Sequence, residues 1–359
     1  MEDPRIYPLT FQPALRDYLW GGRRLETLYG RALPPGVIAE SWEISGHPTA
    51  PTRADAGVWT GQPLPVILAE LGERLVGSAA AWALQRARFP LLVKLLDAQQ
   101  DLSVQVHPGD AYALAHEAGE LGKTEMWYVL HAEPGAGVIL GVKPGVTREV
   151  FAGALQIANR KSQVANRKSP NAVERPLAEL LRRVPVQAGQ AIAIPAGTVH
   201  ALLAGTVVTE IQQNSDATYR IYDWGRVGTD GKPRELHVEK ALDVIDFAPL
   251  CPPILGREQP AGPPTPPALG AGGRIELVRN RYFVVEEVTL ATGTAFDGAA
   301  DGMTLEIWGC LEGQAQVEWA GATVALPAIR YTLLPATLGA FRIVAATPSK
   351  CLRVYLPAP

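Results

Sequence analysis

Polar and apolar residues alternate along short stretches of the chain, and this alternation is the period of a β-strand. It is clearest in DLSVQVHPGD, residues 101–110, where Ser103, Gln105 and His107 share one face and two valines share the other. A Pro-Gly pair directly after the histidine ends the run, because proline cannot donate to a strand ladder. We therefore expect a strand with one dry face and one face that holds something polar.

Comparable stretches rich in valine, isoleucine, threonine and aromatic residues recur, and 35 glycines and 31 prolines punctuate them. This spacing predicts a mostly β protein with tight turns. Strands are expected at residues 89–98, 103–107, 124–130, 137–142, 190–195, 207–214 and 219–224. Helical periodicity is rarer, and helices are expected near residues 64–77, 111–119 and 147–156.

The length of 359 residues predicts two compact units, because such units usually contain roughly 100 to 200 residues. Residues 251–273 are so rich in proline and glycine that neither a helix nor a central strand can persist, which indicates a linker. Residues 1–250 would form the first unit, with its few short helices, and residues 274–359 a second β barrel or sandwich. The second unit contains no histidine, so a histidine-dependent site is expected in the first.

Charge and composition exclude several classes of partner. A net charge of -3, from 33 basic and 36 acidic residues, provides no basic surface for nucleic acid or an anionic membrane. The first residues lack a secretory pattern and no apolar run reaches the roughly 18 residues that span a bilayer, so we expect a soluble, cytoplasmic protein. Cys251, Cys310 and Cys351 are widely spaced and are expected to be small buried hydrophobes. No pattern indicates an oligomeric state.

Two of the six histidines stand in contexts that favour a ligand role. His107 ends a strand at a turn, and His200 follows a strand and a Pro-Ala-Gly turn in AIPAGTVHAL, where the mouth of a barrel would lie. A single histidine is more often structural than a ligand. We therefore predict structural roles for His116, His131 and His237.

The stretch GKTEMWYVL places a carboxylate within an apolar strand, with Lys123 and Glu125 on one face. Burying this anion is costly unless a cation or hydrogen bonds compensate it. One explanation is an ion pair with lysine or arginine. The other is a metal site in which Gln105, His107, Glu125 and His200 supply two nitrogens and two oxygens, a set that suits Zn²⁺ with an exchangeable water. The spacing alone leaves both explanations open.

A second polar stretch, TEIQQNSDATYRIYDW, adds Glu210 and Arg220. If the SDA turn closes a hairpin, both side chains can face the same cavity. The two residues would either form a buried structural ion pair, or Arg220 would bind an anion while Glu210 acts beside it as an acid or base.

Six stretches occur together in the order found in one enzyme family: AESWEISGHP, LLVKLLDAQQDLSVQVHP, GKTEMWYVL, IPAGTVHAL, EIQQNSDATYRIYDWGR and GKPRELHVEKALDVI. Over about residues 10–247 the chain thereby resembles type I phosphomannose isomerases, also called mannose-6-phosphate isomerases, of the cupin superfamily. The resemblance implies two cupin-like, jelly-roll β-barrels and a zinc ion. It also implies interconversion of mannose 6-phosphate and fructose 6-phosphate, so the expected partner is a small-molecule sugar phosphate.

The resemblance also assigns residues. Gln105, His107, Glu125 and His200 fall on the four positions that hold zinc in the family, and Arg220 falls on the family's active-site arginine. Too few residues separate Glu125 from His200 for the large helical insertion of longer members. The chain therefore resembles the short bacterial subgroup.

Isomerisation of an aldose to a ketose moves a proton between C1 and C2 through an enediolate, so it needs a base and a way to stabilise negative charge. Zinc would serve as the Lewis acid, and Arg220 would steady the oxyanion or orient the sugar. Glu210 is the preferred base and Lys123 the other candidate. Ser103, Lys94, Lys123 and Arg220 are candidates for binding the phosphate.

Two other functions remain open from the sequence. The first is a metal-dependent cupin that acts on another substrate with iron or manganese, although such sites commonly use more than two histidines. The second is a non-catalytic sensor of sugar phosphates. A complete ligand set together with Arg220 argues against a sensor, because pure binding does not need both.

Overall fold

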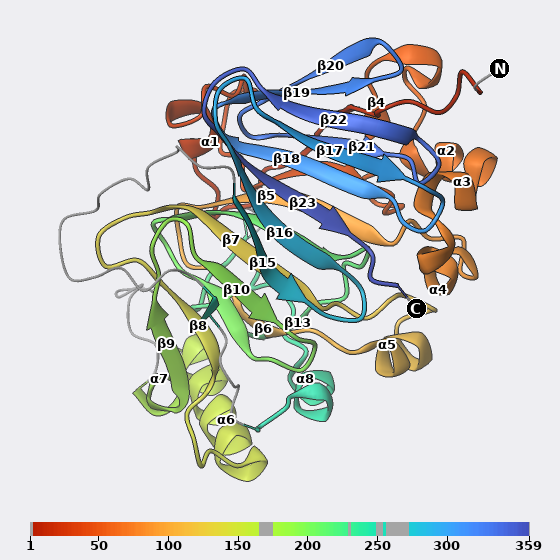
Figure 1. Ribbon diagram of the computed structural model, residues 1–359. Helices are drawn as coiled ribbons and strands as arrows, with labels where there is room; N and C mark the ends of the chain where they lie inside the picture. The colour runs from red at the N-terminus through yellow and green to blue at the C-terminus, as the bar shows by residue number, and fades with distance from the viewer. Residues whose placement is uncertain (1–2, 165–174, 229–230, 249–253, 256–272, 359) are drawn as a thin grey trace.

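The structure is a computed structural model that describes residues 3–164, 175–228, 231–248, 254–255 and 273–358. The predicted mostly β character is confirmed: strands dominate and form several sheets that stack face to face (Figure 1). Within the described ranges each sheet has two open edges, and none closes on itself. No helix in this part of the chain is both long and apolar enough to cross a membrane.

The first sheet is the largest, and apolar clusters pack on both of its faces. One of its inner strands, LLVKLLDA, is buried along its whole length, as expected for a strand covered on two sides. The sheet contains, in spatial order, β14 (Ile254–Leu255), β10 (Ala191–Ile194), β7 (Glu125–Ala132), β12 (Thr206–Gln213), β5 (Leu91–Ala98), β3 (Glu40–Ser45) and β2 (Ala14–Arg16).

The second sheet faces the first. Its spatial order is β13 (Tyr219–Tyr222), β6 (Val104–Val106), β11 (His200–Leu202), β8 (Gly137–Val142) and β9 (Leu181–Pro185). Apolar side chains from both sheets, including Trp127, Ile192, Leu140 and Leu202, form one buried cluster between them. Polar side chains also point into the layer between the two sheets, from β6, β7, β12 and β13. They can therefore meet only beside the apolar cluster.

Helices cover the outer face of the second sheet. Phe151 and Leu155 of α6 (Arg148–Val164), Leu177 of α7 (Arg175–Leu180) and Ala241 of α8 (Val238–Val244) pack against its valines and isoleucines. The remaining short elements are α1 (Arg24–Thr27), α2 (Leu64–Leu71), α3 (Glu73–Val76), α4 (Ala81–Leu84), α5 (Asp110–His116), the 3₁₀ turns Gly57–Trp59 and Ser78–Ala80, and the pair β1 (Phe11–Gln12) and β4 (Arg53–Ala54).

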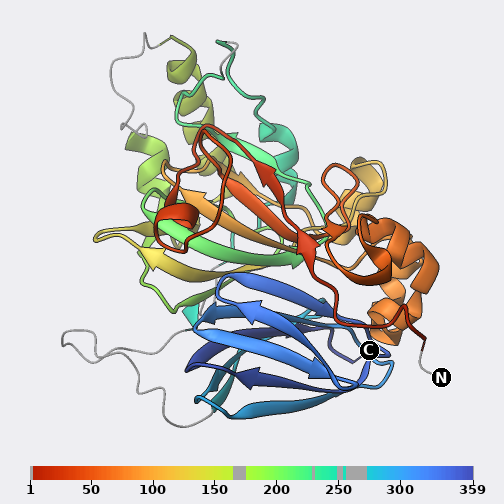
Figure 2. The same cartoon turned by 90° about the horizontal axis from the view of Figure 1, so that it is seen from above.

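Two C-terminal sheets pack on the outer face of the first sheet, where they form a separate stack in Figure 2. The third sheet lies inward, and its order is β15 (Gly273–Arg279), β16 (Val284–Leu290), β23 (Ser349–Tyr355), β18 (Glu306–Glu312) and β21 (Arg330–Leu334). The fourth sheet covers it with β17 (Ala295–Ala300), β22 (Gly339–Ala345), β19 (Gln314–Trp319) and β20 (Ala322–Pro327). Cys310 and Cys351 are buried in this core with free thiols, as predicted, whereas Cys251 lies outside the described residues.

The predicted elements are found with modest changes at their ends. All seven strands exist, and the expected helix at 64–77 is interrupted at Gly72, whose φ of 53° ends α2 and separates it from α3. The helix expected at 147–156 continues to Val164 because its apolar face continues through Ala158. Of the predicted linker, only 254–255 and Gly273 are described, and 254–255 form an edge strand rather than a central one.

Candidate metal centre and active site

Strand register brings the polar side chains of the second sheet together. Gln105 on β6 is paired with His200 on β11 on one side and with Arg220 on β13 on the other. His107 follows directly after β6, and its ring centroid lies 4.7 Å from that of His200. The alternation in DLSVQVHPGD thus has its expected effect, because Gln105 and His107 reach the same layer.

The first sheet supplies the carboxylates that face this row. Glu125, at the start of β7, lies opposite Gln212 on β12. Two residues further along β7, Trp127 lies opposite Glu210, which in turn lies opposite Lys94 on β5. The site therefore lies between two sheets, and neither sheet contains it alone.

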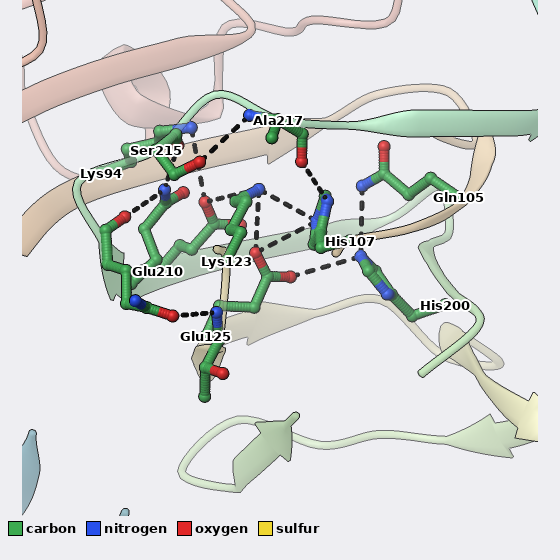
Figure 3. Close-up of polar contacts among 12 residues, drawn as sticks. Lys94, Gln105, His107, Lys123, Glu125, His200, Glu210, Ser215 and Ala217 are labelled. Carbon is green, nitrogen blue, oxygen red and sulfur yellow. Dashed lines mark hydrogen bonds and ion pairs between the residues drawn. The ribbon is translucent and has the colours of Figure 1, made fainter. Parts of the chain in front are cut away.

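His107, Glu125 and His200 form a compact group that could hold a metal ion (Figure 3). Their ligand atoms all lie within 4.8 Å of one another, and each residue is at most 1% exposed. His107 Nε2 lies 3.4 Å from one oxygen of Glu125, and His200 Nε2 lies 3.3 Å from the other. Among the described residues, this is the one such group of histidine, cysteine or acidic side chains.

Backbone carbonyls fix the state of both imidazole rings. Nδ1 of His107 lies 2.9 Å from the carbonyl oxygen of Ala217, and Nδ1 of His200 lies 2.9 Å from that of Thr198. A carbonyl can only accept, so each Nδ1 carries the hydrogen and each neutral ring turns the lone pair of Nε2 towards Glu125. Burial lowers the pKa of His107 to about 3 and also lowers the pKa of His200, which favours the neutral rings.

Glu125 is ionised despite complete burial. Burial raises its pKa, but the charge of Lys123, followed by the contacts with His107, lowers the pKa well below its usual range. Two imidazole lone pairs and a carboxylate thus converge on one point, and neither Glu125 oxygen accepts a well-directed hydrogen bond within the described chain. Lys123 Nζ, 2.9 Å from Glu125, supplies one positive charge beside these acceptors, and the convergence of two imidazole nitrogens and a carboxylate also fits a divalent metal.

Gln105 reaches the same point with its amide group. Its Nε2 lies 3.3 Å from Nε2 of His200, so the amide nitrogen rather than the oxygen is turned towards the histidine. Amide nitrogen and oxygen exchange places by a half-turn of the terminal group. A ligand role for Gln105 would use that second orientation.

A second charged group, around Glu210, lies beside the metal-ligand group. One Glu210 oxygen accepts a 2.9 Å hydrogen bond from Trp127 Nε1, and the other lies 3.5 Å from Lys94 Nζ and 3.8 Å from Lys123 Nζ. Burial, and then the negative charge of Glu125, raise the pKa of Glu210. Lys123 Nζ also lies 2.9 Å from Glu125 and 3.0 Å from His107 Nε2, so it joins the two groups.

The predicted hairpin between residues 210 and 220 is wrong. β12 belongs to the first sheet and β13 to the second, so the chain crosses from one sheet to the other between them. Glu210 pairs with the two lysines, and Arg220 Nη1 donates to the backbone oxygen of Glu235 at 2.9 Å. Of the two alternatives for Glu210 and Arg220, the ion pair is therefore absent from the described contacts of both residues.

Arg220 instead lies in an arginine cluster that the sequence analysis missed. Asp223 binds Arg226 and Arg234, each at 2.6 Å, and Arg226 also donates to the backbone oxygen of Asp101. Burial, followed by the charge of Arg234, lowers the pKa of Arg220. Two guanidinium groups thus share one carboxylate, and the third, that of Arg220, lies near them without pairing to it. The available signal was the presence of all three arginines in the YRIYDWGR and GKPREL stretches.

The other predicted residues lie at varied distances from this centre. Ser103 is buried two residues before Gln105, at the entry to β6. Lys94 is 3% exposed and lies between Glu40 and Glu210, whose charges outweigh burial and raise its pKa. The three histidines predicted to be structural, His116, His131 and His237, do not join the metal-ligand group.

The fold and the site together define the class of this protein. It is a protein of stacked β-sheets with a candidate metal centre made of two histidines and one carboxylate, buried between two of the sheets. The chain is 34% identical to the probable mannose-6-phosphate isomerase GmuF of Bacillus subtilis over 94% of its own length and 96% of the relative's. It is 33% identical to the mannose-6-phosphate isomerase of Streptococcus mutans over 96% and 99% of the two chains. The chain belongs to the type I phosphomannose isomerase family.

Two further comparisons agree with this assignment. Residues 9–135 match the model of the phosphomannose isomerase type I catalytic domain. The structure of a mannose 6-phosphate isomerase from Bacillus subtilis, 30% identical, superposes with a TM-score of 0.77 over 98% of this chain and 99% of that one. The match extends through the C-terminal sheets, so the whole layered arrangement is shared.

Proposed function

We propose that this protein interconverts mannose 6-phosphate and fructose 6-phosphate, using Zn²⁺ held by His107, Glu125, His200 and Gln105. The observation that carries the proposal is the adjacency of the two charged groups, in which Lys123 lies within 4 Å of both Glu125 and Glu210. A candidate metal centre with a carboxylate and an ammonium group beside it meets the needs of an aldose–ketose isomerase. Similarity to mannose-6-phosphate isomerases over nearly the whole chain supports the same reaction.

Zinc is the metal that this donor set suits best. Two neutral imidazoles, one carboxylate and one amide oxygen match the mixed nitrogen and oxygen ligands of catalytic zinc sites. When bound, the ion would supply Lewis-acid stabilisation of negative charge on the sugar oxygens. The backbone carbonyls behind both histidines would keep the rings in the orientation that binds it.

Glu210 is the proposed base of the proton transfer. Trp127 holds one of its oxygens, while the other is buried and accepts no hydrogen bond from the described residues. That free oxygen would remove the C2 proton of the open-chain aldose and return it to C1, passing through an enediolate. Lys94 and Lys123 would keep the carboxylate oriented, and Lys123 remains the second candidate for the base.

The phosphate is proposed to bind at the arginine cluster. Asp223 pairs with Arg226 and Arg234, and Arg220 lies nearby without a carboxylate partner of its own among the described contacts, which leaves an excess of positive charge suited to a phosphate dianion. The buried Nε groups of Arg220 and Arg226 also lack an acceptor within the described chain. Ser103 would contribute a hydroxyl from β6. Lys94, already paired with Glu40 and Glu210, would act on Glu210 rather than on the phosphate.

We also retain the finer architectural predictions as proposals. The first and second sheets would represent one cupin-like jelly roll, in a catalytic unit over residues 1–250, and the third and fourth sheets another, over residues 274–359. The segment 251–273 would join them. A cytoplasmic location fits substrates that are phosphorylated sugars.

Turnover measured with and without metal tests the proposal. The purified protein should convert mannose 6-phosphate to fructose 6-phosphate, lose this activity to a chelator, and regain it with Zn²⁺. Arg220→Ala should retain the metal and lose about 100-fold in kcat/KM, because the phosphate of the sugar would lose one of its guanidinium partners. Binding of mannose 6-phosphate without any turnover would contradict the proposal and favour a sensor.

A further inference from the structure

The C-terminal sheets reach the active-site loops through the carboxylate of Asp110, three residues after His107. We propose that Asp110, held by Tyr282 and Arg281, is a positioning residue that fixes Lys123 against His107 and Glu125. This inference rests on the proposed function only for its kinetic consequence. The contacts that carry it are independent of the reaction.

One oxygen of Asp110 holds the segment that contains Lys123. Asp110 Oδ1 accepts hydrogen bonds from the backbone nitrogen of Gly122 and from Gln213 Nε2, both at 2.9 Å. The amide oxygen of the same Gln213 accepts the backbone N–H of Thr124, also at 2.9 Å. The backbone N–H groups of the two residues that flank Lys123 are therefore tied, directly or through Gln213, to one carboxylate.

The loop that carries His107 is joined to the same segment. The backbone nitrogen of Lys123 donates to the carbonyl of Pro108 at 3.0 Å. Gly122 approaches so closely that a Cβ there would lie 2.4 Å from the backbone nitrogen of Asp110. This close packing places Lys123 Nζ at 3.0 Å from His107 Nε2, so the position of the ammonium group depends on the backbone contacts around Asp110.

The other oxygen of Asp110 is held from the C-terminal sheets. Asp110 Oδ2 accepts hydrogen bonds from the Tyr282 hydroxyl at 2.6 Å and from Arg281 Nη2 at 2.9 Å. Tyr282 is only 7% exposed, and its ring packs edge-on against Trp82 at 5.4 Å. Both Tyr282 and Arg281 lie in the turn between β15 and β16, so the third sheet fixes the carboxylate that fixes Lys123.

A positioning role makes a distinct kinetic prediction. Within the described part of the chain, Tyr282 contacts neither the metal-ligand group nor the arginine cluster, so its loss should spare metal and phosphate binding. Small displacements of a reacting group are costly, and Tyr282→Phe should lower kcat about tenfold with KM nearly unchanged. Asp110→Ala should cause a larger loss of the same kind.

Hydrogen exchange measures the positioning itself, without reference to turnover. In Tyr282→Phe, the amide protons of Gly122, Lys123 and Thr124 should exchange about tenfold faster, because the acceptors that protect them lose their support. Tyr355→Phe is the matched control, because it likewise removes a hydrogen bond from a tyrosine hydroxyl to a carboxylate. That carboxylate is a glutamate within the third sheet, at 3.0 Å. The control variant should leave amide hydrogen exchange at residues 122–124 unchanged, and kcat should also stay the same.

A double-mutant comparison tests whether Tyr282 acts through Asp110. Adding Tyr282→Phe to Asp110→Ala should change exchange and kcat no further, because the intermediary is already gone. Three results would overturn the inference. They are unchanged amide exchange in Tyr282→Phe, additive effects on exchange and kcat in the double variant, and an equal effect of Tyr355→Phe. If the wild-type protein shows no isomerase activity, the proposed function fails, while exchange at 122–124 still decides the positioning role.

Discussion

Glu125 is the residue on which the candidate metal centre depends. It is ionised, fully buried and placed between two imidazoles whose hydrogens are committed to backbone carbonyls. The sequence could predict this group because alternation fixes which side chains share a strand face, and because a carboxylate within GKTEMWYVL demands a cation. It could not reveal the arginine cluster, since Asp223 and Arg234 meet through a loop fold that no periodicity encodes.

Removing the charge of Glu125 should abolish metal binding without unfolding the chain. In Glu125→Gln the two histidines would face a neutral amide, and we expect zinc affinity to fall by about 100-fold or more, with loss of turnover. Metal content after dialysis against a graded zinc buffer measures the affinity directly. Glu318→Gln, on the outer sheet, is the control and should keep one zinc per chain. A Glu125→Gln protein that retains wild-type zinc affinity would remove Glu125 from the ligand set.

The arginine cluster should make stability depend on pH on the acid side. Burial raises the pKa of Asp223, but hydrogen bonds and charge from Arg234 and Arg226 outweigh it and lower the pKa below the usual 3.8. A carboxyl with a lowered folded-state pKa contributes stability that is present above its unfolded pKa and is lost as pH falls through the folded value. Thermal unfolding from pH 6 to about pH 2.5 should show this loss in the wild-type protein.

Asp223→Asn provides the comparison for that pH profile. The variant should be less stable at pH 6, and the difference from the wild-type protein should shrink as the pH falls below about 4, because only the wild-type carboxyl becomes protonated. Parallel profiles for the two proteins would show that Asp223 is not the titrating group.

At the scale of whole elements, burial on both faces made the strands predictable. Stretches such as LLVKLLDA are mostly apolar because the first sheet is covered on both sides, and their ends were placed within a few residues. The sheet to which a strand belongs was not predictable. β12 and β13 look like a hairpin from their turn residues, yet they join different sheets, because long-range pairing rather than local turn chemistry decides the partner.

The loop junction at Gly122 should tolerate no side chain. In Gly122→Ala the new Cβ would lie 2.4 Å from the backbone of Asp110, so the loops must move apart at a cost of about 1–3 kcal/mol, and Lys123 must move with them. Urea unfolding and kcat should both report the change. Gly153→Ala in α6 is the matched control, because its Cβ would meet nothing within 4 Å. That variant should be neutral or slightly stabilised by about 0.5–1 kcal/mol. Equal behaviour of the two variants would contradict the close packing at Gly122.

At the scale of the whole molecule, four stacked sheets place the site in the layer farthest from the C-terminal pair. The third sheet nevertheless supports the catalytic strands from behind: the Tyr331 hydroxyl donates to Thr209 Oγ1 at 2.7 Å, next to Glu210, and Tyr282 holds Asp110. The sequence predicted a second β-rich, histidine-free region but not its packing against β5, β7 and β12, because face-to-face contacts leave no periodic signal. The C-terminal sheets thus support the site without supplying its ligands.

Diffraction at the zinc absorption edge, from crystals of the active enzyme, locates a bound zinc ion directly. An anomalous map should contain one strong peak enclosed by His107 Nε2, His200 Nε2 and the Glu125 carboxylate, and the peak should vanish in His107→Ala. A fully active crystal form with no peak at this position, or with its zinc elsewhere, would contradict the assignment of these side chains as the metal centre.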